Sequence, residues 1–216
     1  EAYKPALTRL YDEKYGIKLL ALYPFHAQMI YCKKPIKGLN DLKGLKIRTF
    51  SKSLSEFVES VGGIGVNIPF AEVVPALQKG VADCAITGAL SGNLAKWFEV
   101  TDYLYELPVG WSMVMMGVNK KSFDKLAPMV QSKIVSEIKS WENTAWEDAR
   151  DETQEGIACN TGGDCSTGIS ADMKLVSVTR KDQKKLERIL KEVIVPSWGE
   201  RCGTECYNEW KALISQ

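Results

Sequence analysis

Residues 42–100 decide the fold. They contain, in order, LKGLKIRTF (42–50), SKSLSEFVESVGG (51–63), VNIP (66–69), FAEVVPALQKG (70–80), ADCAITG (82–88) and ALSGNLAKWFEV (89–100). Short apolar runs alternate three times with helical spacings such as Leu54, Phe57, Val58 and Val61. Glycines mark the ends of the helical segments. This alternation is the βαβ pattern of a parallel sheet covered by helices, and it predicts an α/β fold class. Pro75 predicts that its helix starts late or kinks.

The segments on either side extend this pattern. Periodicity and terminators predict helices at 2–14, 121–157, 180–195 and 206–216, and strands at 17–23, 103–120 and 173–179. Pro196 is expected to end the third of these helices. No linker, internal repeat or low-complexity segment is visible. Two lobes would therefore be joined by strands that cross between them, for which IKLLALYPF (17–25) and PVGWSMVMMGV (108–118) are the candidates.

Composition describes an ordinary globular protein. Of 216 residues, 45% are hydrophobic and 25% charged, and the formal net charge is +1. This charge is too small for the counterion release that dominates nucleic-acid binding, so no nucleic acid is expected as a partner. The apolar runs IKLLALY and WSMVMMGV are too short to cross a bilayer, so no direct membrane insertion is expected. The chain begins EAYKPALTRLYDEKYG, without the pattern of a signal peptide.

A reaction centre is not apparent. His26 is the single histidine, which removes most metal sites and most Ser-His or Cys-His arrangements. SVGGIGV lacks the lysine and serine of a phosphate loop and the dinucleotide spacing, so we expect no cofactor. Glu142 and Asp148 follow the polar pattern of the long helix and are expected on a solvated face. We therefore predict no catalytic residue and no metal ligand.

A ligand site is better supported. In open α/β sheets, ligands sit beyond the carboxyl ends of the strands. Three such ends are predicted, and they place Arg48 with Ser51, Phe70 and Thr87 near one another. An arginine inside a short apolar strand must be paired or solvated, and its planar guanidinium can hold a carboxylate in a bidentate manner. The alternative for Arg48 is a structural salt bridge, and for the others a helix cap or strand terminator.

The six cysteines carry information about redox compartment. Cys159 with Cys165 and Cys202 with Cys206 lie in Gly-, Thr- and Asp-containing segments. Such close pairs fit local disulfides in an oxidising compartment, and a four-cysteine zinc site is the competing interpretation. Cys202 and Cys206 are the weaker pair, because a regular helix holds residues four apart too far from each other. The remaining two, Cys32 and Cys84, lie in apolar runs and are expected to be inert buried thiols.

A family resemblance appears at these residues. LKGLKIRTF, then VNIPFAEVVPALQKGVADCAITG, then KWFEVTDYLYELP resemble the solute-binding proteins of TRAP transporters, the DctP-like periplasmic receptors, over essentially the whole chain. The resemblance implies a two-lobed clamp that closes on a small organic acid and delivers it to a membrane permease. It also implies that Arg48 forms a bidentate salt bridge with the ligand carboxylate, and that Phe70 and Thr87 contact the ligand.

The chain departs from the family pattern at two ligand positions. Many members have an Asp-Gly-Gln-Glu-Asn-Pro run where residues 83–88 read DCAITG, so Thr87 stands where an asparagine is common. Many members also have a second arginine where this chain has Gln28. With fewer charges facing the ligand, a monocarboxylate is expected, with an apolar body against Phe70 and Trp111.

A further departure concerns the start of the chain, because family members carry an additional N-terminal stretch. The resemblance implies the two-lobed architecture of periplasmic binding proteins, with crossing strands, a long helix and an incomplete first lobe. Residues 1–23 would be a remnant of lobe one, 24–112 a nearly complete lobe two, and 113–216 the remainder of lobe one with the C-terminal helices.

The resulting expectation is a periplasmic receptor that binds a small organic carboxylate between two lobes and hands it to TRAP permease subunits. A ligand-sensing module that feeds a signalling partner remains an alternative, and a neighbouring permease gene would separate the two. An enzyme with a closing two-lobed site is disfavoured by the lone His26 and the absence of cofactor motifs.

Overall fold

The computed structural model describes residues 2–214, and its centre is a six-stranded mixed sheet. The strand order is β4-β3-β5-β2-β6-β8. In chain order these strands are β2 (Gln28–Cys32), β3 (Lys46–Thr49), β4 (Ile64–Asn67), β5 (Cys84–Gly88), β6 (Tyr103–Tyr105) and β8 (Lys174–Val176).

The direction of the strands confirms part of the expected parallel sheet. β3 runs parallel to both β4 and β5, as successive βαβ units require. β2 lies antiparallel between β5 and β6, so the sheet is mixed. This antiparallel pairing places the start of β2, at Gln28, opposite Gly88 at the end of β5.

Two apolar cores cover the two faces of this sheet. All five residues of β2 are buried, and they alternate between the faces: Ile30 and Cys32 enter one core, while Met29 and Tyr31 enter the other. Trp97 is fully buried in the second core. Complete burial of a large apolar side chain contributes roughly 1.5–3 kcal/mol, so both cores stabilise the sheet.

Nine α-helices and four 3-10 or π-helical turns are assigned among the described residues. The α-helices are α1 (Lys4–Tyr15), α2 (Lys52–Ser60), α3 (Val73–Gln78), α4 (Ala89–Leu94), α5 (Lys120–Phe123), α6 (Pro128–Asn160), α7 (Arg180–Ile189), α8 (Val195–Cys202) and α9 (Thr204–Ile214). The turns are η1 (Leu39–Leu42), η2 (Phe70–Glu72), η3 (Trp97–Glu99) and η4 (Leu190–Ile194).

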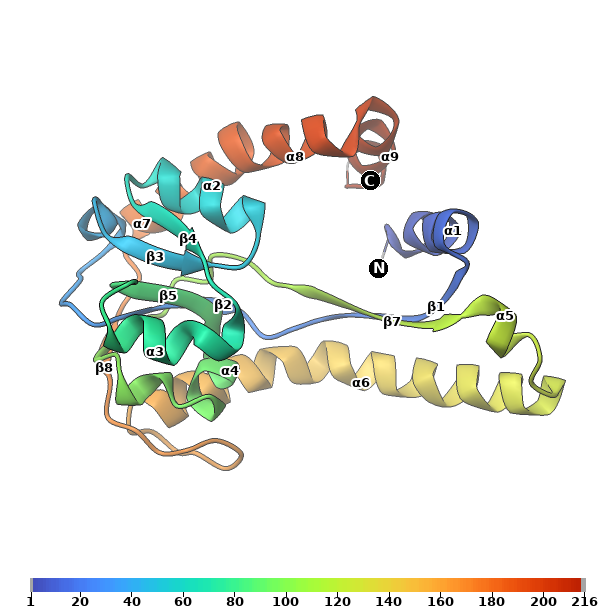
Figure 1. The fold of residues 1–216 in the computed structure, drawn as a ribbon, viewed down its shortest axis with the longest axis horizontal. Coiled ribbons are helices and arrows are strands. Elements are labelled where there is room, and N and C mark those ends of the chain that lie inside the picture. Colours follow the sequence, from blue (N-terminus) through green and yellow to red (C-terminus); the bar gives the residue numbers. More distant parts are fainter. Residues whose placement is uncertain (1, 215–216) are drawn as a thin grey trace.

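A second, two-stranded sheet extends from the first. β1 (Ile17–Pro24) pairs antiparallel with β7 (Met113–Asn119). Figure 1 shows this ribbon of two strands running from the six-stranded sheet toward α1 and α5, with α6 alongside it over its length. The expected crossing strands and long helix are therefore present.

Prolines explain where the helices differ from expectation. The long helix begins only at Pro128, which occupies its first turn, and the short α5 precedes it. Pro75 lies in the first turn of the short α3, which agrees with a late start. Pro196 does not end its helix: a π-helical turn at Leu190–Ile194 restarts the hydrogen-bond pattern, and Pro196 occupies the first turn of α8.

The segment after α6 packs differently from the expected division into 1–23, 24–112 and 113–216. β8 pairs with β6 in the six-stranded sheet, and Leu186 and Ile189 of α7 lie in one of its two cores. Part of the range expected in lobe one therefore packs against the sheet expected in lobe two, because short edge pairing and helix burial are not visible in local periodicity.

Glu142 of α6 is buried rather than solvated. It pairs with Lys4 of α1 and accepts a hydrogen bond from the backbone N–H of Leu22, with the nitrogen 2.6 Å from Oε1. The buried carboxylate thus ties α1, β1 and α6 together. Asp148 is exposed, as expected for the polar face.

Cys32 and Cys84 are not inert thiols, because the structure joins them in a disulfide between β2 and β5. Each strand contributes one buried cysteine at the same register position. Strand periodicity predicts burial but not which residue of another strand lies opposite, so the pairing was missed.

The other four cysteines form the two expected local disulfides, Cys159–Cys165 and Cys202–Cys206. The helical objection to the second pair fails because Gly203, with φ 91°, separates α8 from α9. Figure 1 shows the C-terminal end of α6 and the α8–α9 pair at opposite sides of the molecule. The structure therefore does not gather the four sulfurs into a zinc site.

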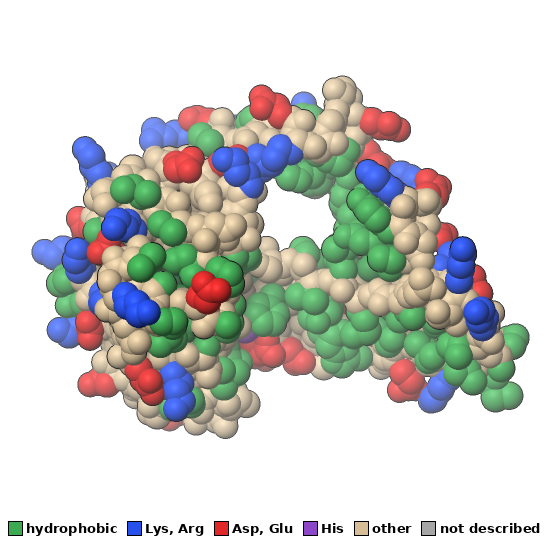
Figure 2. Space-filling view, in the orientation of Figure 1, with side chains coloured by type: hydrophobic (Ala, Val, Ile, Leu, Met, Phe, Trp, Pro, Cys, Tyr) green, Lys and Arg blue, Asp and Glu red, His purple; other side chains and the backbone are tan. Residues whose placement is uncertain are grey.

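One face of the two-stranded sheet is apolar and open. Figure 2 shows hydrophobic side chains gathered over β1, β7, α1 and the first half of α6, beside an opening under α8. The exposed large residues on these elements include Leu10, Met113, Met115, Val135 and Trp141. No helix within residues 2–214 is both long and apolar enough to cross a membrane.

Candidate functional site

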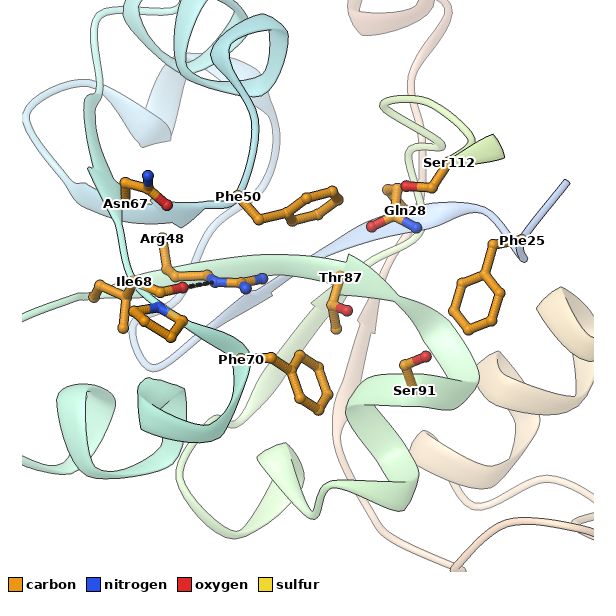
Figure 3. A pocket seen from close by; sticks show the side chains of 11 residues that line it. Phe25, Gln28, Arg48, Phe50, Asn67, Ile68, Phe70, Thr87, Ser91 and Ser112 are labelled. Atoms are coloured by element: carbon orange, nitrogen blue, oxygen red, sulfur yellow. Dashed lines mark hydrogen bonds between the residues drawn. The ribbon is translucent and has the colours of Figure 1, made fainter. Parts of the chain in front are cut away.

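The ends of three parallel strands and the start of β2 surround an open pocket of about 830 Å³. Figure 3 shows the side chains that point into it. Its lining consists of one cation, aromatic rings and neutral polar groups: Phe25, Gln28, Arg48, Phe50, Asn67, Ile68, Pro69, Phe70, Thr87, Ser91 and Ser112. The pocket lies beyond the carboxyl ends of β3, β4 and β5, which is where ligand sites are expected in open α/β sheets.

Arg48 is the charged residue of this lining, and it is only 3% exposed. Its Nε donates to the carbonyl oxygen of Ile68 at 2.9 Å, and Nη1 donates to that of Ile86 at 2.8 Å. No acidic side chain within residues 2–214 forms an ion pair with it, so the structural salt bridge considered above is not formed. Burial lowers the pKa of the Arg48 guanidinium to about 10, at which it remains charged at neutral pH.

Aromatic rings surround this cation. The guanidinium carbon lies 5.2 Å from the ring centre of Phe50, 5.9 Å from that of Phe70 and 5.7 Å from that of Trp97. Trp97 is buried, whereas Phe50 and Phe70 are 40% and 44% exposed at the pocket. These contacts fall within the range of cation–π attraction, so they stabilise the guanidinium without neutralising it.

Gln28 lies across the pocket from Arg48 (Figure 3) and is 3% exposed. Its amide nitrogen donates to the carbonyl oxygen of His26 at 3.2 Å. Its Oε1 is buried and has no hydrogen-bond partner in the described part of the chain. An unpaired buried acceptor is costly, so this oxygen marks a place where a donor is missing.

A hydrogen-bonded chain of three side chains supports the same side of the pocket. The Oγ of Ser91 lies 2.9 Å from Nε2 of His26, and Nδ1 of His26 lies 3.3 Å from Oε2 of Glu152. The backbone N–H of Ser91 also donates to Nε2, with the nitrogen atoms 3.1 Å apart. Burial lowers the pKa of His26, an effect that the hydrogen bond with Glu152 opposes.

The structure brings together four of the six ligand residues expected from the sequence. Gln28, Arg48, Phe70 and Thr87 all line the large pocket. Ser51 and Trp111 instead line an adjoining cavity of about 210 Å³, which also includes Gln28.

Ser51 and Trp111 differ in their local surroundings. Ser51 caps α2 by accepting a hydrogen bond from the backbone N–H of Leu54, as the alternative interpretation held. Trp111 is 57% exposed.

Sequence reasoning missed five of the polar and aromatic lining residues. Phe50 directly follows β3, so the same strand-end rule would have found it. Asn67 is likewise the last residue of β4. Phe25, Ser91 and Ser112 reach the pocket through the packing of β1, α4 and β7 around the sheet, for which local sequence gives no signal.

The chain resembles known proteins over most of its length. The profile of the family described as DctP, bacterial extracellular solute-binding protein, family 7, matches residues 3–197. An ectoine-binding periplasmic protein from Halomonas elongata is 26% identical over 98% of this chain and 61% of its own length. A 2,3-diketo-L-gulonate-binding periplasmic protein from Escherichia coli is 32% identical over 56% of this chain and 38% of its own.

Solved structures give the same picture of the fold. A Bordetella pertussis extracytoplasmic solute receptor that binds pyroglutamic acid superposes with a TM-score of 0.85 at 25% identity, over 98% of this chain and 67% of that one. The Halomonas elongata ectoine-binding protein gives a TM-score of 0.82 at 19% identity, over 99% of this chain and 69% of that one. The chain thus spans about two thirds of the length of these structures.

Proposed function

Because the chain belongs to the DctP family of bacterial extracellular solute-binding proteins, we propose that it is the carboxylate-binding part of an extracytoplasmic solute receptor. The observation that carries this proposal is Arg48, a buried guanidinium with no acidic partner within residues 2–214. A ligand carboxylate would be that partner.

The hydrogen bonds of Arg48 support this role. A guanidinium has five N–H donors, and the carbonyls of Ile68 and Ile86 occupy two of them. These two bonds fix the plane of the group before any ligand arrives. Nη2 remains available to a carboxylate, and Figure 3 shows the end of the guanidinium pointing into the pocket. A charge-assisted pair formed there gains strength from the low local dielectric.

The rest of the lining favours one carboxylate over two. Arg48 is the single charged side chain among the residues that line the pocket, so a second carboxylate would be desolvated without a counter-charge. Phe70 and Phe50 provide apolar walls, and Thr87 provides a hydroxyl. We therefore infer a monocarboxylate with a compact apolar or polar body, and the pyroglutamic acid bound by the Bordetella pertussis receptor is a molecule of this kind.

Ligand binding by the proposed receptor serves transport across the membrane. In the proposed receptor, the ligand bridges two lobes and favours the closed state, in proportion to its higher affinity for that state. A membrane permease then recognises the closed receptor in the periplasm, the compartment of the Escherichia coli and Halomonas elongata binding proteins. A permease gene beside the gene for this chain would support delivery to a transporter over delivery to a signalling partner.

Calorimetric titration of the full chain with a panel of organic acids tests the proposal. We expect at least one monocarboxylate to bind, to bind tighter than its dicarboxylate analogue, and to lose binding in Arg48→Met. Arg180→Met is the matched control, because Arg180 is exposed at the start of α7, away from the pocket. Carboxylate binding that survives Arg48→Met unchanged would contradict the proposed site.

A further inference from the structure

Resting on the carboxylate site proposed above, we propose that the pocket selects carboxylates that also carry an N–H donor. The selecting atoms are two hydrogen-bond acceptors, Oε1 of Gln28 and Oγ of Ser91. Figure 3 shows both side chains across the pocket from Arg48, with Thr87 between them. A ligand that spans the pocket would place its carboxylate at Arg48 and its N–H group at this opposite wall.

The orientation of Gln28 follows from its neighbour. The carbonyl oxygen of His26 can only accept a hydrogen bond, so the side-chain group 3.2 Å from it must be the amide nitrogen of Gln28. Oε1 is therefore directed away from that carbonyl. It is buried and unpaired in the described part of the chain, and the residue is 97% shielded from solvent. A ligand N–H would remove this deficit, whereas a ligand oxygen would add a second acceptor beside it.

The orientation of the Ser91 hydroxyl follows from a chain of donors. The backbone N–H of Ser91 donates to Nε2 of His26, so Nε2 carries no proton. The ring proton of neutral His26 then lies on Nδ1 and is donated to Glu152. Because Nε2 can only accept, the hydroxyl of Ser91 donates its proton to it. The lone pairs of Oγ are left for the pocket, where Ser91 presents an acceptor.

A ligand that lacks an N–H group would leave these two acceptors unpaired and would therefore bind less tightly. A buried acceptor that loses its donor costs more than the hydrogen bond itself contributes, because its hydration is not restored. A site built to pair with an N–H group therefore rejects an analogue that has an oxygen there. We expect a preference of at least about tenfold for the N–H ligand, the factor that corresponds to one unsatisfied polar group.

Two matched pairs of ligands test this selectivity by calorimetry. Pyroglutamate and 5-oxotetrahydrofuran-2-carboxylate share a five-membered ring and differ by N–H against O. N-acetylglycine and acetoxyacetate make the same comparison without a ring. In the unaltered chain, the N–H member of at least one pair should bind at least about tenfold tighter than its oxygen analogue.

Variants assign the preference to the two acceptors. In Gln28→Met and in Ser91→Ala, the ratio of the two affinities should fall toward one. Gln183→Met is the control, because Gln183 is exposed on α7, and it should keep the ratio of the unaltered chain. Circular dichroism and thermal unfolding of each variant show that the fold is retained.

The outcomes separate this inference from the proposed function. Equal affinity within both pairs, with binding still lost in Arg48→Met, would overturn the selectivity and leave the carboxylate receptor standing. Binding of no member of either pair would also overturn the selectivity, and the wider acid panel with Arg48→Met would then decide on the receptor alone. A preference that survives both Gln28→Met and Ser91→Ala would overturn the assignment to these atoms.

Discussion

Cys32 and Cys84 lie directly opposite each other on the antiparallel strands β2 and β5, with their Cα atoms 4.1 Å apart. Both side chains are completely buried, and the disulfide between them crosses the middle of the six-stranded sheet. The bridge encloses β3, β4 and the start of β5, the strands whose ends form the pocket. It therefore links the frame of the candidate site to the strand that carries Gln28.

Removal of this bridge should destabilise the protein strongly. Its cysteines are 52 positions apart, so Cys32→Ala/Cys84→Ala should lower the free energy of unfolding by roughly 3–4 kcal/mol through loss of chain constraint in the unfolded state. Cys159→Ala/Cys165→Ala, whose cysteines are 6 positions apart, should cost less. Urea unfolding measures both. Six reactive thiols in the denatured, unreduced chain would contradict all three disulfides.

Gly156 of α6 lies against the backbone of Ala89 and Leu90 in α4. A Cβ atom placed there would lie 2.2 Å from the backbone nitrogen of Leu90, so Gly156→Ala forces the two helices apart. We expect a loss of about 2–3 kcal/mol in the free energy of unfolding. Gly110→Ala is the matched control, because a Cβ there meets nothing within 4 Å. Equal stability of the two variants would refute the close packing.

Stability should depend on the protonation of His26. Burial lowers the pKa of this residue in the folded state, so the unfolded chain binds the proton more readily. The contribution of neutral His26 is full above the unfolded pKa of about 6.5 and is lost as the pH falls below it. Denaturant unfolding between pH 7.5 and 5 should show a steeper decline for the unaltered chain than for His26→Gln. Parallel curves would show that His26 does not titrate in this way.

Arg48 should not tolerate replacement by lysine. Lysine keeps the positive charge but lacks the planar fork that donates to Ile68, to Ile86 and to a ligand at once. We expect Arg48→Ala to cost on the order of 2–5 kcal/mol of carboxylate binding, and Arg48→Lys to cost at least about tenfold in affinity. Titration with the acid identified for the unaltered chain gives both numbers. Near-normal affinity in Arg48→Lys would show that charge alone suffices.

The sequence predicted the fold and much of the pocket because both depend on local patterns. Strand–helix alternation placed Arg48, Phe70 and Thr87 at strand ends, and the structure gathers them around one pocket. The family resemblance and the two-lobed α/β fold class are confirmed by the family match and the superposed receptors. That family is one of solute-binding proteins, which agrees with the expectation that the chain is not an enzyme.

What the sequence did not reveal depends on contacts between distant segments. Cys84 was expected to be a buried thiol. It forms a disulfide because β2 runs antiparallel beside β5 and places Cys32 opposite it. Ser91 became part of the pocket lining because His26 and Glu152, from β1–β2 and α6, hold it there. Glu142 was expected in solvent because nothing in its own helix indicates the lysine that pairs with it. These side-chain contacts depend on how segments far apart in the sequence are aligned in the folded protein.

The helix α6 runs beside the two-stranded sheet and reaches α4 at the six-stranded sheet (Figure 1). Its 33 residues extend about 50 Å at 1.5 Å per residue. Glu142, near the middle of the helix, anchors it to β1, while Thr153 and Asn160, near its C-terminal end, hydrogen-bond to the backbone just before β2 and in α4. The helix is therefore held along its C-terminal half, while residues 128–141 of its N-terminal half include no buried side chain. Because an α-helix has a fixed rise per residue, two probes along α6 would keep their spacing and serve as an internal ruler against which any movement of α1 or α9 is measured.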